Sequence, residues 1–443
     1  MTVKKLLLAG GVLLSSASAA SASGFQVNLG GQKNIGMGGV GVGLSLDQAA
    51  MFYNPGALAM VRENGVQVGV NAALARISYR SANGGDQRAL QNSVVTPFNF
   101  YAGFGPKDAK YKFGIAVYTP YGSTVKYADG WEGRYALTAI ELTSIYVQPT
   151  FSYAITPQLS VGAGLTILAY GAVNLQKDLP LPTGNGHIEL DGKAKTQFGY
   201  NAGIFFKPSD KLTAGVSYRS KINATVESGD VIFTGLATGA SANLVNRSFT
   251  ATKFGATLPL PAVASVGIGI MPTEKLTIGF DAALTFWSEY RSLDFSFSGD
   301  NGNGAATALP GENTAGRVGG TLATSNFSTS KRAYQDALAF RLGGQYKVDE
   351  KLTVRLGASY DMTPVKDGYL TPETPDADRV IGSAGLSYQV TENFGVDASF
   401  LFQALLKRTQ TQQELLDNGT TDRVAGTYRT NAYVPGIGLH YKF

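Results

Sequence analysis

The sequence predicts an all-β protein: a 14-stranded antiparallel transmembrane β-barrel with an N-terminal plug, or hatch, in its lumen. Three features of the 443 residues predict this fold: short polar turns recur, the segments beside them alternate apolar with small or polar residues, and longer polar connections join the other strand ends. Side chains of a strand alternate between two faces. One face toward lipid, a polar face toward the lumen and loops of unequal length are typical of an outer-membrane barrel.

The first 22 residues are expected to be a signal peptide. Lys4 and Lys5 form a positive region, residues 6–14 form an apolar run, and Ala-Ser-Ala at 20–22 is a small-residue cleavage site. The apolar run is shorter than the ~20 residues that a spanning helix needs. We therefore expect residues 1–22 to be removed and the mature chain to enter the outer membrane of a Gram-negative bacterium.

Residues 23–63 do not follow the strand pattern. A glycine-rich stretch is followed by the more apolar segment 47–60, and neither alternates at a period of two residues. This part of the chain could fold as a small plug inside the lumen. The sequence therefore predicts a hatch at 23–63 and a barrel at 64–443.

Fourteen strands follow from the turns. One strand is expected at about 64–80, one on each side of six turns, and a last one at about 429–443. An even number is typical of single-chain bacterial barrels. The turns lie at 106–110, 156–158, 207–211, 271–275, 347–351 and 390–393.

The strand after the fifth turn illustrates the alternation. In residues 352–361, Val354 and Leu356 share one face, whereas Arg355 and Asp361 share the other. The last strand carries apolar residues at every second position and ends at Phe443, which resembles the assembly signal of outer-membrane barrels.

The longer connections are expected to face the cell exterior and the six short turns the periplasm. The longer connections are rich in Gly, Asn, Thr and Asp. They lie at 81–95, 121–140, 177–193, 228–260, 300–333, 365–378 and 407–428.

Composition argues against an enzyme. The chain has no Cys and two His, so it lacks thiolate sites and offers no cluster of metal ligands. The Gly-x-Gly-x-x-Gly match at 36–41 has no strand before it and no helix-forming pattern after it, as a dinucleotide site requires. We expect no catalytic residue, no cofactor and no metal. The net charge of +5 is small and scattered, so no nucleic-acid partner is expected.

Two features of the strands are open to more than one interpretation. Strand phase turns several charged side chains inward, where they could stiffen the wall as paired charges or bind an anionic head group. Pro120 lies in or at the end of the third strand, where it could mark a simple strand end or a gap in the wall. The inward charges are Arg219, Asp281, Arg341, Arg355, Asp361, Asp397 and Lys442.

Several segments resemble the FadL-type outer-membrane transporters of long-chain fatty acids and aromatic hydrocarbons. Gly-Phe-Gln at 24–26 is similar to the mature N-terminus of that family. Asn-Pro-Gly at 54–56 resembles its Asn-Pro-Ala plug motif, with Gly56 in place of Ala. The segments 258–261, 284–288 and 360–365 are also similar to the family, and the resemblance covers most of the mature chain.

The resemblance implies a hydrophobic ligand that enters from outside, occupies an interior pocket and leaves sideways at a kinked third strand. Phe25 would occupy the pocket and shift when ligand binds. Asn54, Pro55 and Gly56 would form the hatch motif, with Asn54 and Pro55 holding the hatch against the third strand. The kink would comprise Tyr118, Pro120 and Gly122. Asp361 matches the acidic residue near the ligand head group, and the candidate basic partners are Arg341 and Lys177.

The function expected first is passive, ligand-gated transport of long-chain fatty acids. One alternative is an aromatic hydrocarbon channel of the same family, and another is a general diffusion porin, which would lack a plug. An outer-membrane enzyme would need a catalytic constellation at the wall. The expected partners are a hydrophobic small molecule and outer-membrane lipid, and the expected state is a monomer.

Overall fold

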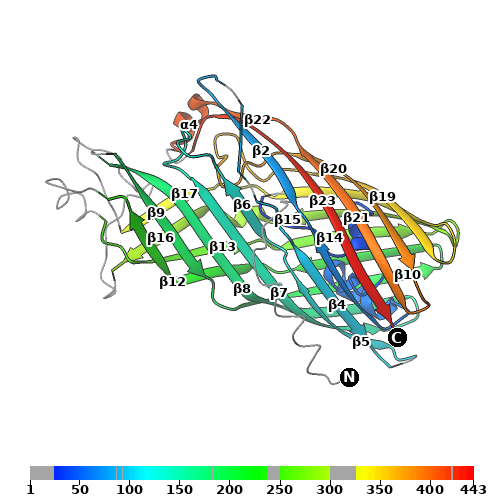
Figure 1. Ribbon diagram of the computed structural model, residues 1–443. Helices are drawn as coiled ribbons and strands as arrows, with labels where there is room; N and C mark the ends of the chain where they lie inside the picture. The colour runs from blue at the N-terminus through cyan, green and yellow to red at the C-terminus, as the bar shows by residue number, and fades with distance from the viewer. Residues whose placement is uncertain are drawn as a thin grey trace.

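The computed structural model describes residues 24–85, 87–91, 93–106, 108–181, 184–236, 249–299, 326–420 and 423–443. The expected signal peptide and most of the expected connection at 300–333 lie outside these residues. Figure 1 shows strands wrapped into one barrel, with the longer connections at one end.

Fourteen antiparallel strands form the closed wall, as the sequence predicted. Each strand pairs with the next in the order below, and the last pairs with the first. The strands are β1 (Gly65–Asn71), β4 (Phe98–Phe104), β5 (Tyr111–Tyr118), β7 (Ala139–Ala154), β8 (Leu159–Leu181), β10 (Gln197–Ser209), β11 (Leu212–Arg219), β14 (Val263–Ile270), β15 (Leu276–Thr285), β18 (Ala337–Lys347), β19 (Leu352–Asp361), β20 (Arg379–Gln389), β21 (Phe394–Leu405) and β23 (Gly426–Lys442).

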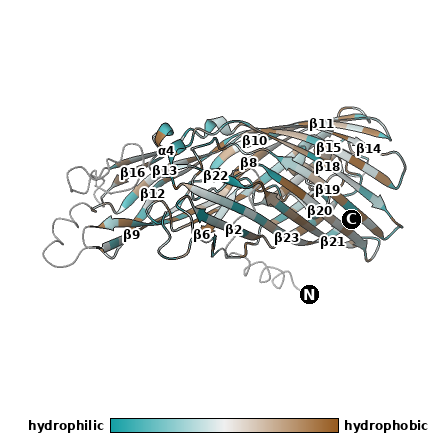
Figure 2. Ribbon diagram, turned by 90° about the horizontal axis from the view of Figure 1, so that it is seen from above, coloured by the Kyte–Doolittle hydropathy of each residue, from teal (hydrophilic) through white to brown (hydrophobic). Residues whose placement is uncertain are grey.

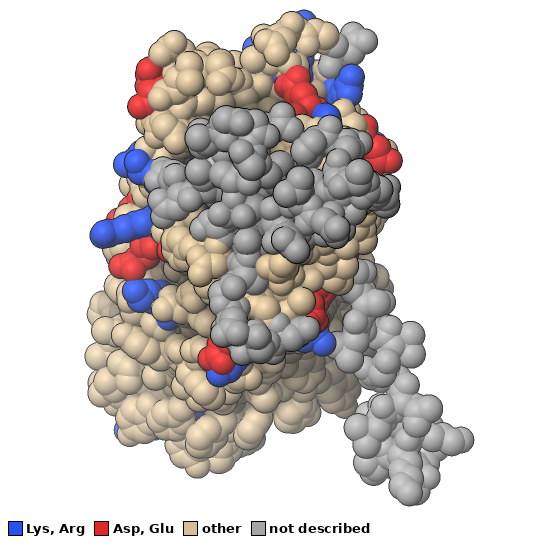
Figure 3. Space-filling model, turned by 90° about the vertical axis from the view of Figure 1, so that its left-hand side faces the viewer, with Lys and Arg blue, Asp and Glu red and all other residues tan. Residues whose placement is uncertain are grey.

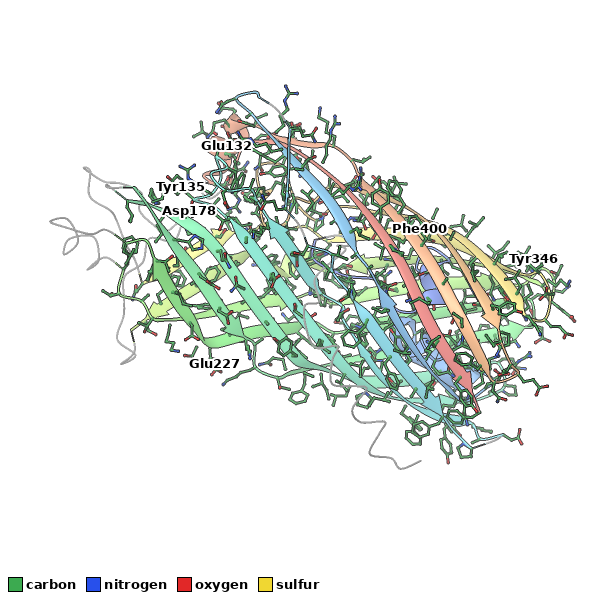
Figure 4. All side chains as sticks on the ribbon, viewed as in Figure 1. Glu132, Tyr135, Asp178, Glu227, Tyr346 and Phe400 are labelled. Atoms are coloured by element: carbon green, nitrogen blue, oxygen red, sulfur yellow. The ribbon has the colours of Figure 1, made fainter. Side chains whose placement is uncertain are left out.

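The alternation of side chains decides which face of the wall meets lipid. On β19 the side chain of Leu356 is 71% exposed, whereas that of its neighbour Arg355 is 5% exposed. Hydrophobic and hydrophilic residues alternate along the strands in Figure 2. Figure 4 labels two of the exposed aromatic residues on the outer surface, Tyr346 and Phe400.

Several expectations about strands were wrong in detail: the expected loops at 121–140, 177–193, 228–260, 300–333 and 407–428 all contain strand residues. The first strand is divided into β1 and β2 (Leu74–Ser81). Both pair with β23 in one register, and between them Ala73 forms an isolated bridge with Val95. The expected loop at 177–193 is largely strand, because Leu179, Ile188 and Leu190 alternate with polar residues and bury one face. The other strands outside the closed wall are β3 (Arg88–Ala89), β6 (Gly122–Lys126), β9 (Gly184–Lys193), β12 (Ile222–Thr234), β13 (Lys253–Leu260), β16 (Ser292–Ser298), β17 (Phe327–Lys331) and β22 (Arg408–Gln410).

These additional strands extend the barrel on the long-loop side. β9, β12, β13, β16 and β17 pair in sequence beside the outer end of β8 and enclose an apolar cluster that includes Phe254 and Phe297. Figure 3 views this end and shows charged side chains of both signs at its edges. The helix α4 (Gln412–Asn418) and the 3-10 helix η4 (Trp287–Glu289) also belong to connections on this side.

The N-terminal segment, residues 24–63, lies inside the barrel. It contains α1 (Gln32–Ile35), α2 (Ala50–Tyr53) and the 3-10 helix η2 (Pro55–Met60). Inward-facing glycines of the wall let its backbone approach closely: a Cβ on Gly43 would lie 2.6 Å from the carbonyl carbon of Gly267, and one on Gly36 would lie 2.9 Å from the Cα of Gly385. β14 and β20, which carry these partners, are well separated in the ring, so the segment crosses the lumen.

No helix among the described residues has the length and hydropathy needed to cross a bilayer.

Candidate functional site

An apolar cavity of about 90 Å³ lies within the outer half of the molecule. Its walls come from β6, β7, β8, β12, β13 and β16, together with Phe25 of the N-terminal segment. The side chains are mostly aliphatic and aromatic, and they include Tyr121, Ile140, Leu142, Leu168, Val173, Leu175, Val226, Phe254, Leu258, Leu260, Tyr290, Leu293 and Phe295. A cavity of this composition favours an apolar ligand over water.

Phe25 closes one side of this cavity with an aromatic cluster. Its ring is 4% exposed and lies edge-on to Trp287, with 4.8 Å between ring centroids. Tyr290 and Tyr121 lie 5.9 and 6.0 Å away. The preceding Gly24 has φ +67°, and a Cβ there would lie 2.7 Å from the Trp287 ring. Glycine is therefore required for this close approach.

The third strand of the wall is interrupted beside Phe25. β5 ends at Tyr118 and β6 begins at Gly122, and both continue along β7. The N-terminal segment pairs with the interruption as a short antiparallel bridge between Gln26 and Tyr121. Two backbone hydrogen bonds flank the bridge: Val27 N–H donates to the Pro120 carbonyl at 2.7 Å, and Gly122 N–H donates to the Phe25 carbonyl at 3.0 Å. The segment thus supplies a backbone partner where the wall strand is broken.

Side chains near the interruption are fixed from other strands. The Tyr118 hydroxyl donates to Gln148 Oε1 at 2.6 Å, and the Tyr121 hydroxyl donates to the Pro261 carbonyl at 3.0 Å. Ser144 Oγ both donates to the Tyr121 carbonyl and accepts from its N–H. These residues, like Pro120 and Gly122, are buried.

The Asn-Pro-Gly motif binds a different part of the wall from the one the resemblance implied. Asn54 Nδ2 donates to the carbonyls of Val42 and of Ile204 on β10, both at 3.0 Å, and Asn54 Oδ1 accepts from Gly56 N–H. The Gly56 carbonyl accepts from Ser152 of β7 and Ser160 of β8. These hydrogen bonds hold the motif against β7, β8 and β10. Contact with the third strand comes instead from the neighbouring Phe52, whose ring lies edge-on to Tyr118 with 5.0 Å between ring centroids.

Gly56 is the residue that departs from the family's Asn-Pro-Ala pattern. A Cβ at this position would lie 2.7 Å from the Gly203 carbonyl oxygen of β10. Pro55 begins η2, where its missing N–H costs no helical hydrogen bond. The chain therefore uses glycine because the wall approaches too closely for an alanine.

The expected ligand residues do not gather at one place. Arg341 and Asp361 line a separate, small cavity of about 20 Å³ between the wall and residues 28–39, and Phe25 does not border it. Asp361 is 2% exposed, and its Oδ1 has no hydrogen-bond partner among the described residues. The expectation that Asp361 and Arg341 share a ligand pocket with Phe25 therefore does not fit this geometry.

Lys177 lies near the apolar cavity without lining it. It is 2% exposed and shares one face of β8 with Val173 and Leu175, which do line the cavity. At this point β8 pairs with β9, outside the closed wall, so Lys177 belongs to the outer extension. Burial lowers the pKa of Lys177 well below its usual range. An anionic partner there would restore the charged form.

A buried ion pair beside the cavity was not predicted from the sequence. Arg332 is 3% exposed, and its Nη2 lies 2.5 Å from Glu373 Oε1. Arg332 Nε donates to the Tyr290 hydroxyl at 3.2 Å, while Glu373 and Tyr290 both line the apolar cavity. Both charged residues lie in connections that lack strand alternation, so no sequence signal pointed to them.

Several inward charges hold the N-terminal segment. Asp281 Oδ2 accepts from the N–H groups of Gly41 and Val42 at 2.7 and 2.9 Å. Arg219 donates to the Phe52 carbonyl at 2.7 Å. Asp397 instead contacts His440 on the adjacent strand of the wall, with 2.8 Å between Asp397 Oδ2 and His440 Nδ1. The inward charges thus serve both the wall and the segment it encloses.

These features match a known family. The family model described as "Outer membrane protein transport protein (OMPP1/FadL/TodX)" matches residues 13–443. The chain belongs to this family. Its members are transport channels, and this family member is a protein of the Gram-negative outer membrane. No group of three or more potential metal-binding His, Cys, Asp or Glu side chains occurs in the described parts of the chain.

Individual relatives are similar over almost their whole length. The long-chain fatty acid transport protein of Escherichia coli O6:H1 is 23% identical, and the match covers 92% of each chain. The crystal structure of a Pseudomonas aeruginosa FadL homologue has a TM-score of 0.77 at 22% identity, covering 95% of this chain and 100% of that one. The Ralstonia pickettii toluene transporter TbuX has a TM-score of 0.63 at 18% identity, covering 96% and 100%.

Proposed function

We propose that this FadL-family protein carries long-chain fatty acids through the outer membrane by ligand-gated passive diffusion. The ligand would occupy the apolar cavity and leave sideways through the wall at residues 118–122. The observation that carries this proposal is the pairing of residues 25–27 with residues 120–122, because one short segment both borders the cavity and closes the broken strand.

The free energies of backbone pairing in the closed gate and of ligand binding in the cavity are similar enough to allow such a gate. Each backbone hydrogen bond contributes about 1 kcal/mol net, so the pair at the interruption contributes about 2 kcal/mol. Each methylene transferred from water into the cavity contributes about 0.8 kcal/mol, so about three methylenes outweigh the pairing. A long acyl chain that displaces the Phe25 ring can therefore also release residues 25–27 from Pro120 and Gly122.

Lys177 supports a fatty acid as the ligand. A buried lysine without an anionic partner is unfavourable, and a carboxylate beside it would form a charge-assisted hydrogen bond. Val173 and Leu175 would guide the acyl chain from Lys177 into the cavity. The name of the Escherichia coli relative agrees with this ligand class.

An aromatic hydrocarbon is the second candidate ligand. Phe254, Phe295, Tyr290 and Tyr121 present rings to the cavity, and such a ligand needs no basic partner. The name of the Ralstonia pickettii toluene transporter, which has the same fold, agrees with this alternative.

Competition between oleate and toluene for a fluorescent hydrophobic probe tests the proposal. We expect oleate to bind more tightly, and Lys177→Met to weaken oleate binding about tenfold while toluene binding is unchanged. The exposed Lys275→Met variant, in a short turn, is the matched control. Open-pore conductance without binding of either ligand would contradict transport through the cavity.

A further inference from the structure

The apolar, lipid-facing side chains of β23 stop at Tyr433 in the direction of the long loops. Phe443, Tyr441, Leu439 and Ile437 face outward and are 62, 47, 43 and 53% exposed. The apolar positions continue at every second residue to Tyr433. Ten steps of ~3.3 Å from Phe443 to Tyr433, tilted by ~40°, give a height of ~25 Å, which equals the apolar band of such barrels. Tyr433 therefore marks the outer interface of the membrane.

Three arginines lie immediately beyond this interface. Arg429 continues the outward face of β23, and Arg76 and Arg80 occupy the outward face of the paired strand β2. Arg429 is opposite Ser78, so Arg76 and Arg80 are its diagonal neighbours at ~7–8 Å between Cα atoms. All three are exposed, and we call them the arginine patch. The Arg76 guanidinium lies 5.5 Å from the Tyr433 ring centroid, which fixes the patch against the interface.

Within the described residues, no acidic side chain balances the charge of the arginine patch. In the described part of the chain, no Asp or Glu forms an ion pair with Arg76, Arg80 or Arg429. Arg80 Nε donates to the Gly85 carbonyl at 3.0 Å, and its other N–H groups have no acceptor among the described residues. The neighbouring outward side chains, Thr427 and Asn431, are neutral. Like charges on adjacent strands repel, so the arrangement is favourable when an external anion lies between them.

We propose that the arginine patch binds the phosphate groups of the outer-leaflet glycolipid, lipopolysaccharide. Guanidinium groups bind phosphate oxygens in bidentate fashion, and the acyl chains of a lipid whose phosphates lie at this level would cover Tyr433 and Ile437. Position and charge both select this occupant: the patch faces sideways, at the depth of lipid phosphates, rather than toward the lumen or the loop tips. This site is separate from the transport cavity.

The test measures stabilisation of the full-length purified protein by lipid A that carries both phosphates. The readout is the temperature at which the folded, fast-migrating band disappears on a gel. We expect lipid A to raise this temperature. The double variant Arg76→Gln/Arg429→Gln should need a lipid A concentration at least about tenfold higher for the same rise in temperature. The band without lipid reports whether the variant folds, and oleate binding should be unchanged.

Two controls keep the result interpretable. Lys347→Gln/Lys351→Gln removes two exposed lysines at the short-turn end and should respond to lipid A like the unmodified protein. Lipid A stripped of phosphate should stabilise poorly, and inorganic phosphate alone should not replace lipid A. An unchanged response of the arginine variant, or equal stabilisation by stripped lipid A or by inorganic phosphate, would overturn the proposal.

Discussion

The two ends of the N-terminal segment are held by different forces. Residues 32–60 are fastened by buried polar contacts from around the wall: Gln32 contacts Asn71 and Ser399, Thr213 Oγ1 donates to the Gly43 carbonyl at 2.6 Å, and Asn54 bonds to β10. Residues 24–27 are held mainly by aromatic packing, two backbone hydrogen bonds to the broken strand and one from Gly24 N–H to Asp376. The difference indicates that residues 32–60 form a fixed body, whereas residues 24–27 form a short leading strand that can respond to ligand.

Deleting residues 23–43 removes the leading strand and residues 32–43 of the fixed body, so it should have the largest effect. The wall strands pair with one another without this part of the chain, so the barrel should still fold and show heat-modifiable mobility. Ion conductance in planar bilayers should rise severalfold because the lumen loses its filling. A deletion variant that fails to fold would show that the fixed body is required for the barrel itself.

Asn54→Ala should loosen the fixed body while leaving the leading strand in place. The substitution leaves the Val42 and Ile204 carbonyls and the Gly56 N–H without their partner, at a cost of about 3 kcal/mol or more in total. Hydrogen exchange followed by mass spectrometry should show faster exchange at residues 41–60. Asn83→Ala in an exposed turn is the control, and equal exchange in the two variants would refute the fixed-body assignment.

Tyr121→Phe should have the smallest effect and act on the leading strand. It keeps the ring that lines the cavity but removes the hydrogen bond from its hydroxyl to the Pro261 carbonyl, worth about 1 kcal/mol. Spontaneous opening in single-channel recordings should become about fivefold more frequent, with oleate affinity unchanged. If oleate affinity fell and opening stayed constant, Tyr121 would be a ligand contact rather than part of the closure.

The architecture of the wall could be predicted because it depends on a local pattern. Alternation at a period of two assigned Arg355 to the lumen and Leu356 to lipid, and the polar turns located the strand ends. The strand content of 177–193 was missed because glycine and proline near residues 180–186 are typical of a loop. Its pairing depends instead on Leu179, Ile188 and Leu190 meeting a distant cluster.

The arrangement of the candidate site could be predicted only in part. Pro120 indicated an interruption of the strand, but nothing local indicates that Gln26 pairs with Tyr121, because the two residues belong to segments far apart in the sequence. The hydrogen bond from Asn54 to Ile204 of β10 was not predicted for the same reason. Strand phase placed Asp361 on the lumen face, and the family resemblance placed Phe25 in an interior pocket. Neither could show that the two residues border different cavities of one lumen.

A disulfide across the bridge between Gln26 and Tyr121 tests the central claim most directly. The flanking hydrogen bonds make this a non-hydrogen-bonded pair with Cα atoms ~4.5 Å apart, within the range for a disulfide. The chain has no Cys, so Gln26→Cys/Tyr121→Cys would form a single engineered bond. Oleate uptake into liposomes should stop when the bond is oxidised and return on reduction of the same sample. Equal uptake in the oxidised and reduced states would contradict opening at residues 120–122.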